Sequence, residues 1–219
     1  MSETDEWTAA WTAEKVAGHH QVLTAKTVSG NALRILTKRR KAGILIATFS
    51  VDVVERKDLE RVHTGSDVEF VMSVPKGAVF RFSAIAYAEA NSFGLGGLSD
   101  LYVAINENSF REYISKETRF ILRGLRQHTM VQNVARITDR LYEVHRYGGL
   151  GSARVLALNE YDLTAEAVRT GIERHGECDL ILTSNPNCRP SSESIQAATS
   201  AGVRVLKWAE LLGALNNAK

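Results

Sequence analysis

The clearest pattern of apolar and polar residues lies between Cys178 and Leu215. A short apolar run at residues 179–183 predicts a strand, and the polar stretch from Ser184 to Asn187 that follows it is typical of a turn. A serine-capped helix, a second strand at 203–206 and a last helix complete this part of the chain. Strands that alternate with helices favour parallel pairing, so we expect an α/β fold with a parallel or mixed sheet flanked by helices.

A similar pattern lies about 110 residues upstream. Residues 68–77 parallel residues 179–188, which sets Pro75 opposite Pro186, with one residue gapped after the turn. Residues farther upstream follow the same spacing, and Asp52 matches Asp162 there. The nearly constant spacing favours two similar strand–helix halves. Apolar runs and alanine-rich helices are common, however, so two unrelated strand–helix units can also be aligned in this way.

The N-terminal residues 1–42 are expected to form a helical segment. One helix covers residues 4–16, and a second begins at Gly30 and ends in the basic run 38–41, whose cations either complement the helix dipole or contact phosphates. Trp7 and Trp11 lie four residues apart on one face of the first helix. They anchor this helix to the body of the protein or, as the alternative, form a surface for a protein partner or a second copy.

The rest of the chain is expected to divide at a glycine-rich linker, residues 148–151. The first α/β half, residues 43–147, contains a long helix that begins at Asn108 or Ser109 and a hairpin at 133–145. The second half covers residues 152–219. One continuous domain is the alternative.

Composition indicates a soluble globular protein, with 44% hydrophobic and 24% charged residues. The net charge of +2 is too small to identify a partner. Cys178 and Cys188 flank a predicted strand, which holds them too far apart for a disulfide and favours a reducing compartment. No apolar run is long enough to span a bilayer, and the polar, acidic start is unlike a signal peptide. We therefore expect a cytoplasmic protein with no membrane contact.

A stripe of arginines is the most suggestive basic surface in the sequence. Arg119, Arg123 and Arg126 stand at i, i+4 and i+7, which places them on one face of the predicted long helix, and His128 follows at its end. Such a stripe is either solvated or contacts the phosphates of DNA or RNA.

Polar residues gather where the predicted strands end. In a parallel sheet, ligands bind beyond the carboxyl ends of the strands, where loops and helix N-termini meet. The candidates for a pocket that takes a nucleotide or another small anion are Ser73, Lys76, Ser184, Asn185, Asn187 and Arg189. The same residue types also favour turns and helix caps, which is the alternative interpretation.

The order of elements in the second part of the chain resembles a known family. A hairpin that carries an acid is followed by a strand with a charged end, a helix, the strand DLILTS, a serine-capped helix and GVRVLKWAELL. Over residues 119–215 this is similar to restriction-endonuclease-like domains of the PD-(D/E)xK, Mrr-type group. The resemblance implies that Asp139 or Glu143 supplies the first acid and Glu160 the second, and that they hold Mg²⁺ or Mn²⁺ to activate water. The triplet that begins at Glu160 is Glu-Tyr-Asp, which departs from the family pattern because it has no lysine.

Three functions follow from these patterns. The preferred one is a nucleic-acid-binding protein on a nuclease-like scaffold, with metal-dependent hydrolysis at Asp139 and Glu160. The alternatives are a non-catalytic nucleotide- or anion-binding module and an assembly subunit that uses Trp7 and Trp11. Steep salt dependence of polynucleotide binding favours the first, saturable stabilisation by a small ligand the second, and concentration-dependent mass the third.

Overall fold

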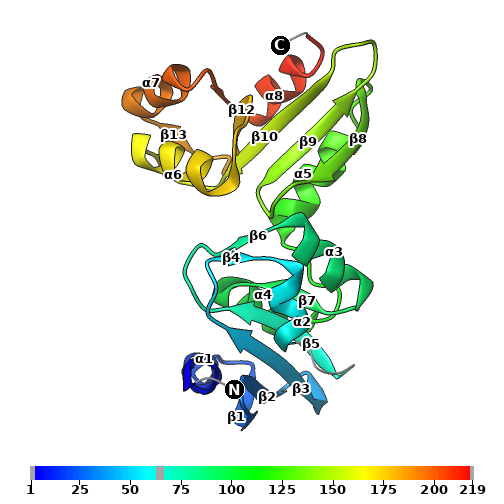
Figure 1. Cartoon of the computed structure of the whole chain (residues 1–219), viewed down its shortest axis with the longest axis vertical. Helices are drawn as coiled ribbons and strands as arrows, with labels where there is room; N and C mark the ends of the chain where they lie inside the picture. The colour runs from blue at the N-terminus through cyan, green and yellow to red at the C-terminus, as the bar shows by residue number, and fades with distance from the viewer. Residues whose placement is uncertain (1–2, 63–66, 218–219) are drawn as a thin grey trace. The chain divides into compact units, whose positions relative to one another are not determined.

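The chain forms two compact units, residues 1–115 and residues 116–219. The computed structural model describes residues 3–62 and 67–217. Figure 1 shows the elements of both units, each of which is a sheet between two layers of helices. The expected α/β class is confirmed.

The first unit is built on a five-stranded mixed sheet with the order β1-β2-β3-β5-β7. Its elements are α1 (Glu3–Ala17), β1 (Val22–Ser29), β2 (Ala32–Thr37), β3 (Arg40–Phe49), β4 (Val53–Val54), α2 (Arg56–Val62), β5 (Val68–Ser73), β6 (Val79–Phe80), α3 (Phe82–Ala90), β7 (Gly94–Gly96) and α4 (Leu98–Glu107). Strands β1, β2 and β3 pair antiparallel, and β3, β5 and β7 pair parallel. α1 and α4 bury one face of this sheet, and α2 and α3 bury the other.

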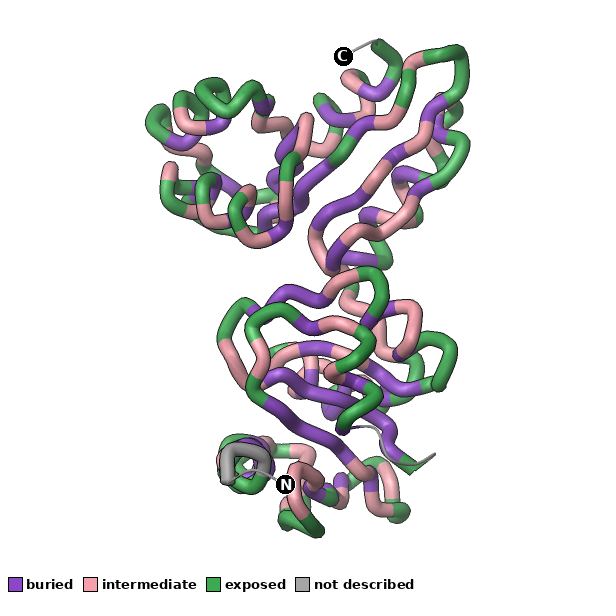
Figure 2. Tube along the Cα trace, viewed as in Figure 1, coloured by how far each residue is buried: buried purple, intermediate pink, exposed green. Residues whose placement is uncertain are grey.

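The second unit repeats this topology, with the sheet order β8-β9-β10-β12-β14. Its elements are α5 (Lys116–Arg126), β8 (Val131–Arg136), β9 (Leu141–Arg146), β10 (Ser152–Leu158), β11 (Asp162–Leu163), α6 (Ala165–His175), β12 (Leu180–Thr183), β13 (Arg189–Pro190), α7 (Ser192–Ser200), β14 (Arg204–Leu206) and α8 (Trp208–Ala214). Again the first three strands pair antiparallel and the last three parallel. α5 and α8 cover one face and α6 and α7 the other. Figure 2 shows that the buried residues concentrate on the central strands.

The predicted similarity of the two halves is confirmed at the level of single hydrogen bonds. α3, β7 and α4 begin 110 residues before α7, β14 and α8. The N-termini of α4 and α8 are capped in the same way: Gly97 N donates to Asp100 Oδ2 at 2.9 Å, and Lys207 N donates to Glu210 Oε2 at 2.7 Å. A carboxylate at the third helical position satisfies a backbone N–H that the helix leaves unpaired.

The register of the repeat differs in detail from the sequence alignment. In the turns that follow β5 and β12, Ala78 N donates to the carbonyl of Pro75 and Cys188 N donates to that of Asn185. Pro75 therefore corresponds to Asn185, and no residue is gapped. Upstream, the carbonyls of Asp52 and Tyr161 accept the equivalent bonds, so Asp162 is not the partner of Asp52.

The predicted helix at residues 30–41 is wrong, because this segment is β2, a turn and the start of β3. Leu33, Ile35 and Thr37 are buried on alternate positions, which is the period of a strand. The predicted start of the long helix also differs. Asn108 ends α4 in the left-handed conformation with φ of 54°, and α5 begins only at Lys116.

The expected linker at residues 148–151 is instead the turn that joins β9 to β10, and three of its glycines have positive φ. The break between compact units lies at Ser115–Lys116, so α5 and the β8–β9 hairpin belong to the second unit. The N-terminal segment 1–42 is not separate either, since β1 and β2 join the first sheet.

Three smaller expectations concern tryptophans, cysteines and membrane contact. Trp11 packs against the core between α1, the sheet and α4, whereas Trp7 is 52% exposed. Cys178 and Cys188 are both free thiols, as expected. Within the described residues, no helix has the length and apolar character that a membrane span requires.

Candidate functional site

Helix α5 presents two chemically different faces. Thr118, Ile121 and Leu125 are buried and pack toward the sheet. Arg119, Arg123 and Arg126 are all exposed on the opposite side of the helix, as the 3.6-residue period requires. The geometry of the expected arginine stripe is therefore present, on the first helix of the second unit.

The other end of the same helix holds a polar cluster centred on Glu117. Asn159 Nδ2 donates to Glu117 Oε2 at 3.0 Å, and Arg140 Nη1 donates to Oε1 at 3.4 Å. The Ser184 hydroxyl also donates to Oε1. We refer to Glu117, Arg140, Asn159 and Ser184 as the Glu117 cluster. The Glu117 side chain is only 22% exposed, so these donors replace most of the water that an isolated carboxylate requires.

The cluster lies at the carboxyl ends of parallel strands, which is where parallel α/β sheets bind ligands. Asn159 directly follows β10 and Ser184 directly follows β12, and these two strands are parallel neighbours. Their carboxyl ends therefore meet at one edge of the sheet, the position that the sequence rule selects for Ser184. Sequence reasoning missed Glu117 and Arg140. An acid in the first turn of a helix is common because it complements the helix dipole, so the sequence around Glu117 does not distinguish it from an ordinary surface acid.

Asp139 and Glu160, the acids that the family resemblance implies, lie in different loops. Asp139 is in the β8–β9 turn, with Oδ1 3.9 Å from His175 Nδ1. Glu160 is exposed in the loop after β10. Among residues 3–62 and 67–217, no group of three or more His, Cys, Asp or Glu side chains is arranged to hold a metal ion.

His128 is fixed inside the second unit. Its Nδ1 accepts a hydrogen bond from Met130 N at 3.2 Å, so Nε2 carries the hydrogen and donates to the carbonyl of Leu212 at 3.0 Å. Both ring nitrogens are used, and the ring ties the end of α5 to α8. This arrangement leaves His128 no N–H for a phosphate.

The predicted anion-binding residues are divided between the units. Ser73 and Lys76 belong to the first unit. Ser73 is buried, and its hydroxyl donates to the carbonyl of Val51 at 2.7 Å, so it is engaged with the loop that follows β3. Lys76 is exposed in the turn between β5 and β6. Of the two candidates in the first unit, Lys76 therefore faces solvent and the Ser73 hydroxyl does not.

The remaining candidates form the turn after β12 in the second unit. Asn185 Oδ1 accepts from Asn187 N at 2.9 Å, which is a local turn contact. The Arg189 guanidinium lies 5.4 Å from the centre of the Tyr161 ring. Of the predicted anion-binding residues in the second unit, Ser184 is the one with a described hydrogen bond to Glu117.

Among its described residues, the first unit has no equivalent of the Glu117 cluster. The residue that corresponds to Ser184 is Val74. Val74 N donates to the carbonyl of Phe49, and Ser184 N donates to the carbonyl of Leu158 in the same way. At the matching helix, the hydroxyls of Thr8 and Thr48 hydrogen bond to each other at 2.9 Å and are both fully buried. The two halves thus share a fold but differ in their chemistry at this edge.

Comparison of the chain with protein-family models, with curated proteins and with solved structures found no match.

Proposed function

We propose that this protein binds nucleic acid through the exposed face of α5, on a nuclease-like α/β scaffold. The observation that carries the proposal is the segregation of charge on this helix. Arg119, Arg123 and Arg126 are exposed, whereas Glu117, the only acid of the helix, is turned toward Asn159 and Ser184. The outward face is therefore basic along three turns.

Arginines in this arrangement suit phosphates. The guanidinium group donates two parallel hydrogen bonds to phosphate oxygens, and successive turns of a helix spread such groups along a backbone. The second unit has 14 lysines and arginines and 11 acids, so its overall field adds to the attraction. Phe120 is 57% exposed, 4.9 Å from the Trp208 ring, and offers an aromatic edge for a sugar or an unpaired base.

The scaffold part of the proposal rests on the order of elements. The β8–β9 hairpin carries Asp139, β10 leads to Glu160, and α6, β12, α7, β14 and α8 follow. This is the order on which the resemblance to PD-(D/E)xK domains was based. Metal-dependent hydrolysis of phosphodiesters at Asp139 and Glu160 is the more specific form of the proposal.

Binding is tested by Arg123→Gln/Arg126→Gln in the full chain. Affinity for labelled single- and double-stranded DNA and RNA is measured across a salt series. Two cations contribute up to about 1.8 to the slope of log affinity against log salt, so the variant should bind more weakly and with a shallower slope. The control Arg169→Gln/Arg204→Gln removes the same charge from exposed residues of α6 and β14. Equal losses of affinity in both variants would show that binding depends only on net charge and would overturn the proposal that the α5 face is the binding surface.

Hydrolysis is tested in the same reactions by adding Mg²⁺ or Mn²⁺. The proposal expects metal-dependent cleavage that Glu160→Gln and Asp139→Asn abolish while binding is retained. Cleavage that survives both substitutions would move the reaction to another site. Binding without cleavage would reduce the function to a non-catalytic nucleic-acid-binding scaffold.

Self-association through α1 is a second candidate, favoured by the exposed Trp7. Light scattering across a concentration series tests it. Trp7→Gln should lower the average mass, whereas a mass that stays monomeric at every concentration in the unmodified chain would exclude it.

A further inference from the structure

One face of strands β1 and β2 is not covered by a helix. On the opposite face, Leu33 and Ile35 are buried in the core that α1 and α4 close. The core under α2 and α3 includes residues of β3 and β5, but no described residue of β1 or β2. Outward-pointing residues of these two strands therefore face solvent, and Lys26 and Arg34 are exposed there.

Lys26 and Arg34 are directly opposed across the β1–β2 pair. Like charges in this position destabilise a sheet unless an anion lies between them. Gly43 on β3 provides the space for the arginine, since a Cβ at Gly43 would lie 2.8 Å from Arg34 Cδ. The stem of Arg34 thus crosses β3, and its charge lies on the open face.

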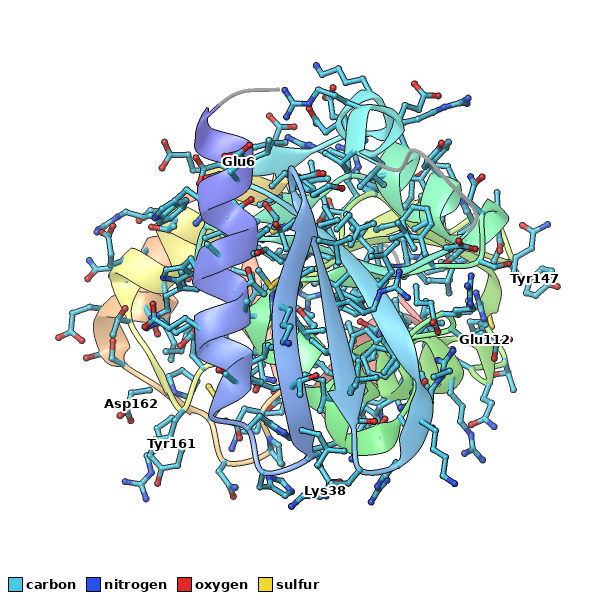
Figure 3. All side chains as sticks on the ribbon, turned by 90° about the horizontal axis from the view of Figure 1, so that it is seen from below. Glu6, Lys38, Glu112, Tyr147, Tyr161 and Asp162 are labelled. Atoms are coloured by element: carbon cyan, nitrogen blue, oxygen red, sulfur yellow. The ribbon has the colours of Figure 1, made fainter. Side chains whose placement is uncertain are left out.

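The β2–β3 turn adds more cations at the end of the same strands. Lys38 and Arg39 form the turn and are exposed, and Lys41 is exposed on the first residues of β3 (Figure 3 labels Lys38). Among the described residues, no carboxylate pairs with any of these three side chains. Arg40 differs, because both of its terminal nitrogens donate to Glu69, at 2.6 and 2.9 Å.

The sequence around these strands has no acid. Between Glu14 and Asp52 there is no aspartate or glutamate, although the first unit as a whole has 14 acids and 13 lysines and arginines. The positive charge is therefore concentrated on β1, β2 and β3 and is not a general property of the unit. We refer to Lys26, Arg34, Lys38, Arg39 and Lys41 as the basic platform.

The second unit shows what the same face looks like when its charge is balanced. On β9 and β10, Glu143 lies 3.6 Å from His145 Nε2 and 3.7 Å from Arg154 Nε. His145 Nδ1 is also within 2.7 Å of the Ser152 hydroxyl. The two units share one topology but differ in charge on this face. In the described part of the second unit, an acid on β9 lies beside the cations of β9 and β10, whereas the cations of β1, β2 and the β2–β3 turn have no such acid on these strands.

From these observations we infer that the basic platform binds the phosphate backbone of a nucleic acid. It is a second binding surface, on the first unit, and it does not depend on the α5 face. Residues 22–42 contain no aromatic side chain, so the platform offers no aromatic ring on which a base could stack. Its contacts are therefore to phosphates, which makes binding insensitive to sequence and steeply dependent on salt.

The test compares two variants of the full chain that lose the same charge. Lys38→Gln/Arg39→Gln/Lys41→Gln alters the platform, and Arg56→Gln/Lys57→Gln/Arg61→Gln alters α2, where Arg56 and Lys57 are already paired with Glu60 and Glu55. The platform variant should bind a labelled DNA or RNA duplex about tenfold more weakly, with a salt slope shallower by up to about 2.7. The α2 variant should bind like the unmodified chain. Equal binding by all three proteins would overturn the inference.

A local readout separates this surface from α5. Lysine acetylation followed by mass spectrometry is measured with and without the duplex. The inference expects protection of Lys26, Lys38 and Lys41, but not of Lys57. Protection near α5 alone, at Lys116, would overturn the platform and leave the proposed function standing. If the platform lysines are protected and Arg123→Gln/Arg126→Gln does not change binding, the platform stands and the proposed α5 surface is overturned.

A membrane surface is the competing anionic partner. Vesicles of phosphatidylcholine with and without phosphatidylserine are used in the same acetylation experiment. Protection of Lys38 and Lys41 by phosphatidylserine vesicles but not by nucleic acid would overturn the inference. Protection by the duplex and not by vesicles would support it.

Discussion

The hydroxyl of Ser184 donates a hydrogen bond to the carboxylate of Glu117 and so joins the end of β12 to the first turn of α5. The same carboxylate holds Asn159 at the end of β10. One side chain on the helix thus fixes two neighbouring strand ends. The helix that carries the exposed arginines is held at its first turn by this contact and at its end by His128.

Glu117→Ala should destabilise the second unit. The substitution removes the acceptor for Ser184, Asn159 and Arg140. The hydrogen bonds of Ser184 and Arg140 are partly buried, and partly buried donors without an acceptor cost about 1–3 kcal/mol. Urea unfolding monitored on the full chain measures the loss. Glu173→Ala, on the exposed side of α6, is the control and should change the free energy of unfolding by less than about 0.5 kcal/mol. Equal effects would contradict a specific role for Glu117.

Gly124→Ala should also destabilise the second unit, through a steric effect. A Cβ at this position would lie 2.2 Å from Trp208 Cζ2, so either the Trp208 ring or α5 would have to move. Overpacking of this kind costs about 1–3 kcal/mol. In Gly213→Ala no atom lies within 4 Å of the new Cβ, and the gain in helix propensity should stabilise α8 by up to about 1 kcal/mol. Thermal unfolding of the two variants should therefore shift in opposite directions.

Arg40 and Lys41 are neighbours in sequence with different expected roles. Glu69 has only 6% of its side chain exposed, and Arg40 is the nearer of two described charge partners, at 2.6 Å against 3.6 Å for Arg111 Nε. Arg40→Gln removes the two short hydrogen bonds while Arg111 stays, so it should lower the free energy of unfolding of the first unit by about 1–3 kcal/mol. Lys41→Gln should leave stability unchanged and weaken nucleic-acid binding. A stable Arg40→Gln protein would show that the Arg40–Glu69 pair does not hold the hairpin.

Asp100 and Glu210 cap equivalent helices, but we expect them to contribute different amounts to the free energy of unfolding. Each accepts a hydrogen bond from the backbone at the start of its helix, and Asp100 also accepts from the Tyr113 hydroxyl at 2.9 Å. Loss of a cap costs about 0.5–2 kcal/mol. Asp100→Ala should be the more harmful of the two in denaturant unfolding, and the reverse order would contradict the role of Tyr113.

Alkaline pH should destabilise the second unit through Cys178. Burial, with the nearby Asp179 carboxylate, raises the pKa of this thiol from 9.0 to about 11. The folded state then holds the proton more tightly than the unfolded state. Stability from this group is complete below the unfolded pKa and falls as pH rises from about 9 to 11. Urea unfolding across this range should show a smaller decline in Cys178→Ala than in the unmodified chain; parallel declines would contradict the assignment.

Local periodicity predicted the parts of the fold that are locally determined. The strand Leu180–Thr183 and the helices after it follow from an apolar run, a turn and a serine cap within one short stretch. The prediction for the segment Ala32–Thr37 was wrong, because Leu33 and Leu36 also fit the spacing of a helix. Its strand state is decided by pairing with β1 and β3, which no local window contains.

The candidate site was predictable only in part, for a similar reason. Ser184 follows from the rule on strand ends, and the arginine stripe follows from helical spacing. Glu117 lies 67 residues from Ser184 in sequence, so nothing near either residue indicates that they meet. The basic platform was visible only as the basic run 38–41. The contribution of Lys26 and Arg34 was hidden, because these two residues face each other only after β1 and β2 have paired.

The continuity of each unit in sequence has a consequence for biosynthesis. Every described strand of the first sheet precedes Ser115, and every described strand of the second sheet follows it. The first unit can therefore complete its hydrogen bonding while the second half of the chain is still on the ribosome. Folding of one copy before the other exists keeps two sheets with identical strand order from exchanging strands, the error to which tandem domains of similar structure are most exposed.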